Sequence, residues 1–364
     1  MTICLIGKNL TTLVLSKIFA DNDISVELYY TESKRSKNLH STLSRTIGLS
    51  NDSINFLESH KILDKKKCWN IKQINLYKGK KFESFLNFRP KNSCFLMTSY
   101  NNFYKNLETK IKNNKLIKIK KKTKSNFSLG LIKKNYEMII ITDINNSLFK
   151  KYFSKHFKKN YNSMAFTTII NHQKIKNDVA EQFFTEFGPL AFLPISKTQT
   201  SIVFSIFDKN LAQDKKKILK LIEQYNRNYD IKNVNKLEKF PINLSLSRKY
   251  FYKNILLFGD TLHKIHPLAG QGFNMTLRDT KILNELIKKN LNLGLNLSTV
   301  LDRFEIKRKN SNFVFAMGID FIHEFFKLNY KYNFKFIDRF FKFINKNIYI
   351  KKKIEKLADK GLDL

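Results

Sequence analysis

The stretch Gly259–Asp279, GDTLHKIHPLAGQGFNMTLRD, decides the fold class of this chain. The apolar run Asn254–Phe258 (NILLF) directly precedes it and is expected to be a strand of a parallel sheet. The Asp260 carboxylate then falls at the carboxyl end of a strand, where open α/β sheets bind their ligands. A carboxylate in this place can accept hydrogen bonds from the hydroxyls of a sugar-like chain.

Two glycines, Gly270 and Gly272, let the backbone in AGQGFN approach a planar ring closely. A helix is expected from about Phe273, and the N–H groups of Gly270–Asn274 at its start form a site of positive potential. Such a site suits a ring edge that becomes anionic on reduction. Gly-Asp ends many strands and Gly-x-Gly opens many helices, so the signal lies in their joint order and spacing.

The beginning of the chain has the pattern of a βαβ unit. Residues 2–6 form a short apolar run, residues 10–20 carry helical periodicity, and residues 24–30 alternate between apolar and polar. A later apolar run, residues 137–142, is expected to be another parallel strand. These segments predict a dinucleotide-binding sheet.

Between about residues 164 and 206, successive apolar runs with turn signals between them predict an antiparallel sheet. Parallel-type strands precede and follow it, so we expect an α/β fold in which a Rossmann-like domain is interleaved with a β-rich (α+β) substrate domain. The expected boundaries are 1–70, 97–160 and 245–300 for the dinucleotide-binding domain, 71–96 and 161–244 for the β-rich domain, and 301–364 for a helical C-terminal region.

The charge balance is strongly basic. Lys and Arg number 67 against 30 acidic residues, a formal net charge of +37. Nucleic acid or an anionic membrane are the usual partners of such a chain. The lysines are spread along the whole sequence without a zinc-finger, RNP-like or basic heptad pattern, and the richness in Lys, Asn, Ile, Phe and Tyr is typical of A/T-biased coding. Nucleic-acid binding is therefore not favoured.

Cys4, Cys68 and Cys94 are widely spaced, which is typical of a reducing compartment and predicts no metal site.

Met1 leads directly into TICLIG without a signal-peptide pattern, so we expect a cytoplasmic location. The apolar stretch Phe313–Tyr330 contains charged side chains and is not expected to span a membrane.

The segment Gly259–Asp279 resembles the third FAD motif of the FAD-dependent aromatic hydroxylases, the p-hydroxybenzoate hydroxylase-like flavin monooxygenases. It is most similar to the ubiquinone-biosynthesis branch, whose pattern is close to GDAAHxxHPxAGQGxNxGLRD. Arg45–Ser50 (RTIGLS) resembles the RTIALS stretch of that branch, Ala180–Phe183 its AxExF segment, and Gly188–Pro194 its GPLALLP segment. The resemblance extends in order over nearly the whole chain.

The resemblance implies FAD as cofactor and NAD(P)H as electron donor. It assigns no catalytic side chain, and His263 and His266 are expected to have a structural or flavin-edge role. Mapped onto this sequence, the family motifs imply the following FAD-binding residues: Gly7, Asn9, Thr12, Glu32, Arg45, Asp143, Gly259, Asp260, Pro267, Gly270, Gln271, Gly272, Phe273 and Asn274.

The first two family motifs are incomplete in this chain. The GxGxxG fingerprint keeps only Gly7, with Asn9 and Thr12 at the other glycine positions. The ribose-binding acid falls on Tyr30, which leaves Glu32 as the only nearby carboxylate. In the second motif Ile144 follows Asp143 where the family has glycine. We therefore expect a weakened grip on the ADP half of FAD and impaired reduction by NAD(P)H.

The implied reaction is hydroxylation by O2 of the aromatic ring of a (poly)prenylated phenol, through a flavin C4a-hydroperoxide. The β-rich domain is expected to position the ring, and the resemblance also implies partners in a ubiquinone-biosynthesis complex. Phenylalanines in the C-terminal region alternate with lysines and suggest either helix packing or peripheral contact with an anionic membrane: Phe313, Phe315, Phe321, Phe325, Phe326, Phe340 and Phe341.

Two alternatives remain at this stage. One is a degenerate, non-catalytic flavin-fold protein that supports a biosynthetic complex, which the incomplete first and second motifs favour. The other is a basic nucleic-acid or membrane-surface binder, which the net charge favours.

Overall fold

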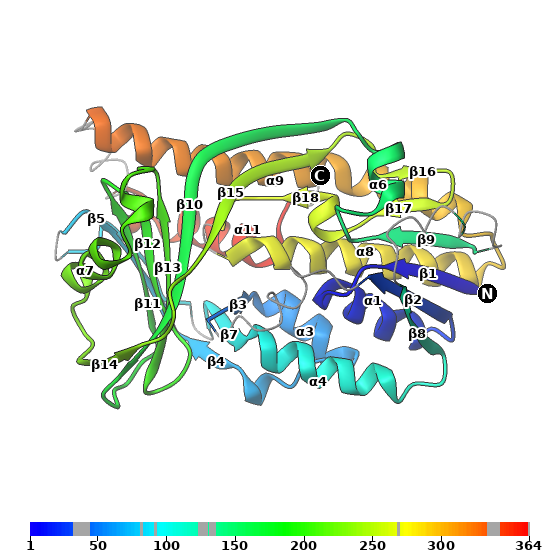
Figure 1. Ribbon diagram of the computed structural model, residues 1–364, viewed down its shortest axis with the longest axis horizontal. Helices are drawn as coiled ribbons and strands as arrows, with labels where there is room; N and C mark the ends of the chain where they lie inside the picture. Colours follow the sequence, from blue (N-terminus) through cyan, green and yellow to red (C-terminus); the bar gives the residue numbers. More distant parts are fainter. Residues whose placement is uncertain are drawn as a thin grey trace.

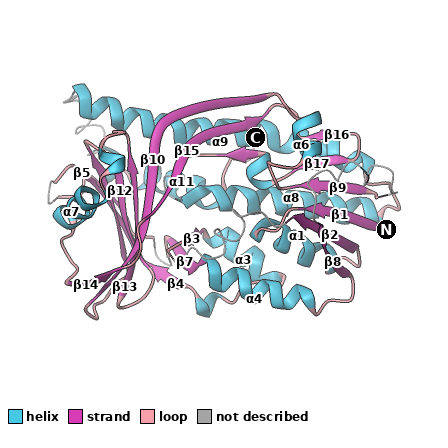
Figure 2. Cartoon of the chain, in the orientation of Figure 1, coloured by secondary structure: helices cyan, strands magenta, loops and turns pink. Residues whose placement is uncertain are grey.

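The computed structural model describes residues 1–31, 44–80, 83–90, 93–122, 130, 136–267, 270–332 and 343–362. Two sheets lie at opposite ends of an elongated molecule, and long helices run between them (Figure 1). Helices and strands alternate in the half that holds the N-terminus, while the other half is dominated by strands (Figure 2). The expected α/β fold with an interleaved β-rich part is confirmed.

The sheet near the N-terminus has six described strands in the order β16-β17-β9-β1-β2-β8. β1 pairs in parallel with β2 and β9, β9 with β17, and β2 with β8. Only the edge strand β16 is antiparallel. The strands are β1 (Thr2–Ile6), β2 (Ser25–Thr31), β8 (Ile117–Lys122), β9 (Met138–Ile141), β16 (Phe251–Tyr252) and β17 (Ile255–Leu257).

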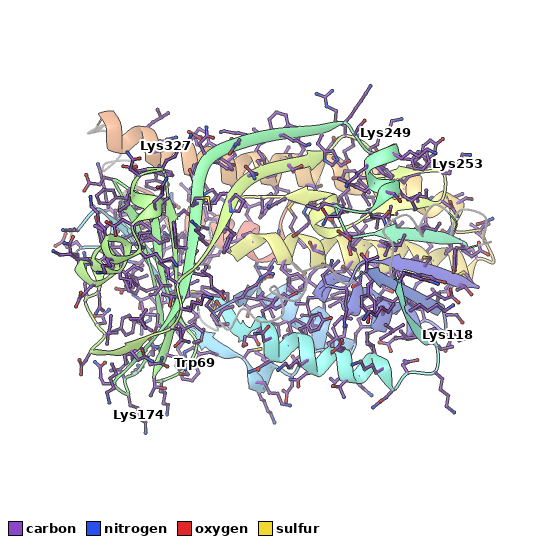
Figure 3. All side chains as sticks on the ribbon, in the orientation of Figure 1. Trp69, Lys118, Lys174, Lys249, Lys253 and Lys327 are labelled. Atoms are coloured by element: carbon purple, nitrogen blue, oxygen red, sulfur yellow. The ribbon has the colours of Figure 1, made fainter. Side chains whose placement is uncertain are left out.

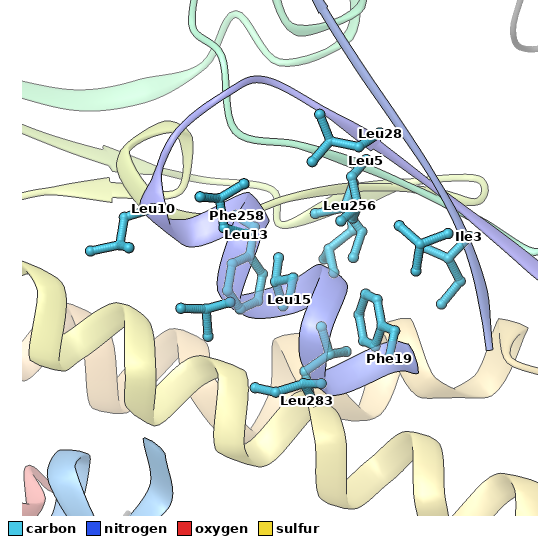
Figure 4. Close-up of a cluster of buried hydrophobic side chains, with 14 of the residues drawn as sticks. Ile3, Leu5, Leu10, Leu13, Leu15, Phe19, Leu28, Leu256, Phe258 and Leu283 are labelled. Atoms are coloured by element: carbon cyan, nitrogen blue, oxygen red, sulfur yellow. The ribbon is translucent and has the colours of Figure 1, made fainter. Parts of the chain in front are cut away.

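The largest core surrounds this sheet because its central strands are apolar on both faces, as parallel sheets require. β9 is buried at every position. Figure 4 shows side chains from β1, α1 (Leu10–Ala20) and α8 (Gln271–Asn292) gathered together, among them Phe19 of α1 and Leu283 of α8. α8 begins two residues before the expected start at Phe273.

The second sheet has the order β18-β15-β10-β13-β12-β11-β5-β6, with β14 also paired to β10. β5 joins β11 in parallel, whereas the other pairs are antiparallel. Its strands are β5 (Gln73–Lys78), β6 (Leu86–Phe88), β10 (His156–His172), β11 (Val179–Thr185), β12 (Gly188–Pro194), β13 (Gln199–Ile206), β14 (Ile231–Val234), β15 (Glu238–Ser247) and β18 (His263–Lys264).

β10 is 17 residues long and passes from the N-terminal half into the second sheet (Figure 1). Its register against β15 shifts between Asn160 and Ser163, where Asn162 has a φ of 50°. A bulge bends a strand and increases its twist, so this one turns β10 from one half into the other. Beyond the bulge, α7 (Lys215–Tyr225) covers one face of the second sheet and forms a separate apolar core.

A three-stranded sheet with the order β3-β7-β4 lies between the halves. The remaining described elements are β3 (Thr46–Leu49), β4 (Trp69–Ile71), β7 (Phe95–Ser99), α3 (Asn51–Ser59), α4 (Tyr100–Lys112), α6 (Ser147–Tyr152), α9 (Ser298–Tyr332), α11 (Ile348–Lys360) and the short 3-10 helices η1 (Lys65–Lys67), η2 (Leu211–Gln213) and η3 (Gly259–Thr261). No helix in the described part of the chain is long and apolar enough to cross a membrane.

The positive charge is distributed over both halves. Exposed lysines lie at several edges of the molecule, with Lys249 and Lys253 near one another and Lys118, Lys174 and Lys327 far apart (Figure 3). Within the described ranges these lysines do not gather into the single basic stripe typical of a nucleic-acid interface.

Gly188 opens β12 with a φ of +131°, and a Cβ there would lie 1.9 Å from the Ser205 carbonyl oxygen on β13. We expect Gly188→Ala to destabilise the protein by about 3 kcal/mol, because the clash is with backbone and the φ is strained for any side chain. Urea denaturation measures the loss.

Gly294→Ala is the matched control, since its φ is +64° but its Cβ would meet nothing within 4 Å. Backbone strain alone predicts a cost of about 1 kcal/mol there. Equal losses in the two variants would show that the contact with Ser205 is not tight.

Candidate functional site

Three parallel strands, β1, β9 and β17, end at one edge of the first sheet, and the turns that follow them form one end of the site. The turns are in close contact. A Cβ on Gly7 would lie 2.3 Å from the Thr142 hydroxyl oxygen, and one on Gly259 would lie 3.3 Å from the Thr11 side chain. Both glycines have positive φ, so each turn requires glycine.

Asn9 is the N-cap of α1 and forms a capping box with Thr12. The Asn9 side-chain oxygen accepts from the Thr12 N–H at 3.1 Å, and the Thr12 hydroxyl oxygen accepts from the Asn9 N–H at 3.1 Å. The Asn9 amide nitrogen donates to the Thr142 hydroxyl at 2.9 Å. Asn9 and Thr12 therefore stabilise the turn in which they replace two glycines of the GxGxxG fingerprint.

The end of β2 presents Tyr30 beside this turn, with the Lys8 ammonium 4.7 Å from the centre of its ring. Glu32, the carboxylate expected near the ribose, lies outside the described residues. A hollow of about 20 Å³ is lined by Gly7, Tyr30 and Asp143, with Ile6, Thr31, Asn145 and Asn146 completing its wall. A space of that size holds about one water.

Asp143 follows β9 and is only partly buried. Its carboxylate accepts from the Asn145 N–H at 2.9 Å, which closes a short turn, and its carbonyl oxygen accepts from the Asn146 N–H at 3.1 Å. Asp143 thus lies at the sheet edge near Gly7, but its carboxylate already has a partner within its own turn.

Arg45, just before β3, and Asp260, in η3, both interact electrostatically with Tyr100. The Arg45 guanidinium lies 4.3 Å from the centre of the Tyr100 ring. Burial raises the pKa of the Tyr100 phenol; Arg45 and a hydrogen bond to the Leu10 backbone oppose this rise, and Asp260 adds to it. Because Arg45 and Asp260 are both exposed, they present a cation and an anion to a ligand at this edge.

The start of α8 forms the other end of the site. Gly270 is the N-cap, with a φ of 63°, and no side chain in the described residues caps the helix there. Its N–H donates to the Pro267 carbonyl oxygen at 3.2 Å, which sets the turn into the helix. Gly270 is exposed and Gln271, Gly272 and Phe273 are partly exposed, so this helix start faces open space with its positive end.

Asn274 is buried and joins the start of α8 to β3. Its amide oxygen accepts from the Ser50 N–H at 3.0 Å, and its amide nitrogen donates to the Gly48 carbonyl oxygen at 2.9 Å. Asn274 therefore positions the two motifs relative to each other, RTIGLS and AGQGFN, and its side chain faces β3.

A buried charged network lies behind this helix, and sequence reasoning missed it. The Asp279 carboxylate is fully buried and pairs with His263 and Arg308, each at 2.6 Å. Asn312 donates to Asp279 at 3.0 Å and to the Tyr250 hydroxyl at 3.2 Å. Burial acts to raise the pKa of Asp279, but Arg308 and His263 outweigh it and hold this pKa below its usual range.

Asp279 is the last residue of the segment Gly259–Asp279, but no local sequence pattern indicates Arg308 on α9. His263 now has a structural partner, in line with the structural role expected for it.

His266 precedes Pro267 and lies against a second buried histidine, His323 of α9, with ring centres 4.2 Å apart. Tyr161 of β10 contacts both rings and donates to Asp320 at 2.7 Å. Burial and the neighbouring His323 lower the pKa of His266 to about 3, so its imidazole is neutral near neutral pH. The pair fixes the loop before α8 against α9 and β10.

The structure thus brings together most of the residues expected to bind a cofactor, in two groups. The first group contains an exposed cation, Arg45, and an exposed anion, Asp260. It also contains the start of α8, whose positive end has no side-chain cap in the described residues. Gly7, Asn9, Thr12 and Asp143 form a turn region whose polar groups largely bind one another. The first group fits a planar ring with a hydroxylated chain, whereas the second leaves little room for a nucleotide.

Comparison with protein families finds one matching model, squalene epoxidase, over residues 135–345. Among curated proteins, the chain is 24% identical over 214 residues to the mitochondrial ubiquinone biosynthesis monooxygenase COQ6 of Danio rerio, covering 47% of this chain and 44% of that protein. It is 29% identical over 162 residues to the 3-demethoxyubiquinol 3-hydroxylase of Escherichia coli, covering 42% of this chain and 41% of that protein. The matches therefore span less than half of these relatives.

Solved structures share the fold over the whole chain. The p-nitrophenol 4-monooxygenase PnpA of Pseudomonas putida matches with a TM-score of 0.79 at 12% identity, covering 100% of both chains. HpxO of Klebsiella pneumoniae, solved with FAD and uric acid, matches with a TM-score of 0.72 at 10% identity, covering 99% of this chain and 97% of that one. The expected resemblance to the aromatic hydroxylase fold and the ubiquinone branch is confirmed.

We expect Asp279→Asn to destabilise the protein by about 3–5 kcal/mol at neutral pH, because it leaves the Arg308 guanidinium buried without a counter-charge. Chemical denaturation measures the change. Asp52→Asn is the control: its ion pair with Lys281 at 3.1 Å is partly exposed, and its loss should cost less than about 1 kcal/mol.

The wild-type protein and Asp279→Asn should also differ in how their stability depends on pH. The Asp279 pKa is lowered on folding, so its stabilisation is present above the ordinary carboxyl pKa and is lost as pH falls through the lowered value. The wild-type protein should therefore lose more stability on acidification than Asp279→Asn. Parallel acid limbs for the two proteins would contradict this role of Asp279.

Proposed function

Because this chain belongs to the squalene epoxidase family, we propose that it is an FAD-dependent monooxygenase that uses NAD(P)H and O2 to hydroxylate the aromatic ring of a (poly)prenylated phenol in ubiquinone biosynthesis. The observation that carries the proposal is the start of α8. Its cap at Gly270 is a left-handed glycine without a side-chain partner in the described residues, and a Cβ there would lie 3.9 Å from the backbone nitrogen of Gly48 in the RTIGLS stretch.

The proposed substrate class is based on the names of the curated proteins that this chain resembles. The proteins that match over nearly half of this chain are named as ubiquinone-biosynthesis monooxygenases and hydroxylases. The motifs shared with that branch, RTIGLS and GPLAFLP, lie on β3 and β12, so the similarity includes the substrate domain as well as the cofactor edge.

The flavin ring would be held at the start of α8. The N–H groups of Gln271 and Gly272 and the helix dipole would stabilise negative charge on its edge, while Asp260 would accept from the ribityl hydroxyls. When bound and reduced, FAD supplies the activation of O2 that side chains cannot provide. The protein contributes orientation and a water-excluding environment.

The inner face of the second sheet supports a role in substrate positioning. Leu190 and Phe192 of β12 point toward α7, and Leu193 packs instead with residues of the three-stranded sheet. The Thr46 hydroxyl donates to the Ser201 hydroxyl at 2.9 Å and ties β3 to β13. Partly buried apolar side chains line the boundary between these sheets and suit a prenyl tail: Trp69, Ile74, Cys94, Phe95, Leu193 and Ile195.

We also propose that the protein is cytoplasmic and contacts an anionic membrane peripherally, where a prenylated substrate would reside. Phe313 and Phe321 on α9 are 47% and 67% exposed, and Ile348 at the start of α11 is 70% exposed. Phe315 and Phe326 are buried, so helix packing accounts for those two. Phe340 and Phe341 lie outside the described residues.

The decisive experiment combines a spectrum with an assay. The purified protein reconstituted with FAD should show an absorption band of bound oxidised flavin at about 450 nm. With NAD(P)H and O2 it should hydroxylate a short-chain prenylphenol, and a strain lacking the gene should accumulate quinone precursors. Absence of the flavin band would remove the enzyme proposal altogether.

A flavin band without turnover supports the second candidate, a non-catalytic flavin-fold protein within a biosynthetic complex. The observation that favours it is the self-bonded turn at Gly7–Thr12, together with Ile144, 49% exposed, beside Asp143. Co-purification with other enzymes of quinone synthesis, without hydroxylation by the isolated chain, is the result that it predicts.

Asp260→Ala should lower the affinity for FAD more than Glu32→Ala, because the third motif is intact and exposed whereas the first is not. Removal of one carboxylate–hydroxyl contact corresponds to about a tenfold rise in the dissociation constant. Titration of flavin fluorescence measures both variants. Equal losses would show that the nucleotide end contributes as much as the ring end.

A further inference from the structure

We propose that this chain recognises a flavin through its ring and ribityl half, and that its own side chains occupy the place where the adenosine diphosphate half of FAD would bind. The inference rests on the proposed function, because it concerns the same site. It predicts a flavoprotein with little preference for FAD over FMN.

The chain itself provides partners for two of the N–H groups at the start of α1, those of Asn9 and Thr12. Helix N-termini bind phosphates because their first N–H groups lack partners. Here the Thr12 N–H donates to the Asn9 side chain at 3.1 Å, and the Asn9 N–H donates to the Thr12 hydroxyl at 3.1 Å. A pyrophosphate would have to displace these partners.

Asn9 is also held from the opposite side. Its amide nitrogen donates to the Thr142 hydroxyl at 2.9 Å, and the Thr142 hydroxyl donates to the Ile6 carbonyl oxygen at 3.2 Å. Asn9 therefore bridges the ends of β1 and β9 and the start of α1. Rotating it away would break a capping bond and an inter-strand bridge together.

Among the described residues, little space is left beside Gly7 for the base and ribose. The hollow beside Gly7 holds about 20 Å³, and the Tyr30 ring forms part of its wall. Tyr30 cannot chelate a ribose diol as a carboxylate does. The nearby cation, Lys8, is paired with Glu108 at 3.1 Å, which offsets its attraction for phosphate.

The end of the site that would hold the flavin ring differs from the end beside Gly7. Gly270 caps α8 without a side chain, and Arg45 and Asp260 are exposed. Polar groups are therefore available at the ring end and internally paired at the nucleotide end, so most of the binding free energy is assigned to the ring and ribityl half.

The first test compares dissociation constants of the full chain for FAD, FMN and riboflavin by fluorescence titration. FAD and FMN should bind within about tenfold of each other, equivalent to about 1.4 kcal/mol. Millimolar ADP should not displace either flavin. FAD binding about a hundredfold tighter than FMN, or displacement by ADP, would overturn the inference and leave the proposed function intact; failure of all three flavins to bind would overturn both.

The second test frees the start of α1. Asn9→Gly removes the side chain that occupies the Thr12 N–H, and should raise FAD affinity about tenfold while leaving riboflavin affinity unchanged. Asp214→Gly removes a comparable cap, that of α7, whose carboxylate accepts from the Lys217 N–H at 3.0 Å, and should change neither affinity.

Thermal unfolding of both variants verifies that they are folded. An unchanged FAD-to-riboflavin ratio in folded Asn9→Gly would overturn the inference. Should Asn9→Gly fail to fold, the wild-type comparison of FAD, FMN and ADP decides the matter by itself.

Discussion

The charged contact between Asp279 and Arg308 is the constraint on which the arrangement of the site depends. Asp279 lies in the third turn of α8, Arg308 in α9, and His263 in β18, and all three side chains are buried. A buried carboxylate is costly unless its partners are held in good geometry. Meeting that requirement fixes α8 against α9 and β18, and with it the direction in which Gly270–Asn274 point.

The two ends of the site show how hydrogen-bond partners decide where a ligand can bind. At α8 a glycine cap has no side chain to offer, so the helix polarity remains available. At α1 an asparagine cap and a threonine satisfy each other, so the same kind of helix start is closed. Replacing glycine with a capping residue thus stabilises a helix and removes an anion site in one step.

Much of the fold and one half of the site were predictable from the sequence. Asn254–Phe258 and Gly259–Asp279 form the expected strand, turn and helix, and residues 2–30 form the expected βαβ unit, because apolar periodicity and glycine position are local signals. The pairing of Asp279 with Arg308 was not predictable, since it joins residues on different helices without a shared pattern. Asn9 and Thr12 counted as losses against a family motif, yet their spacing of three residues is that of a capping box.

β10 belongs to both halves of the molecule, and this has a mechanical consequence. It pairs with β15 from His156 to Thr167 and with β13 from Met164 to Asn171, so one continuous ladder crosses the bulge. Because β15 accompanies β10 across the bulge, the connection between the halves is a hydrogen-bonded two-stranded ribbon and not two independent linkers.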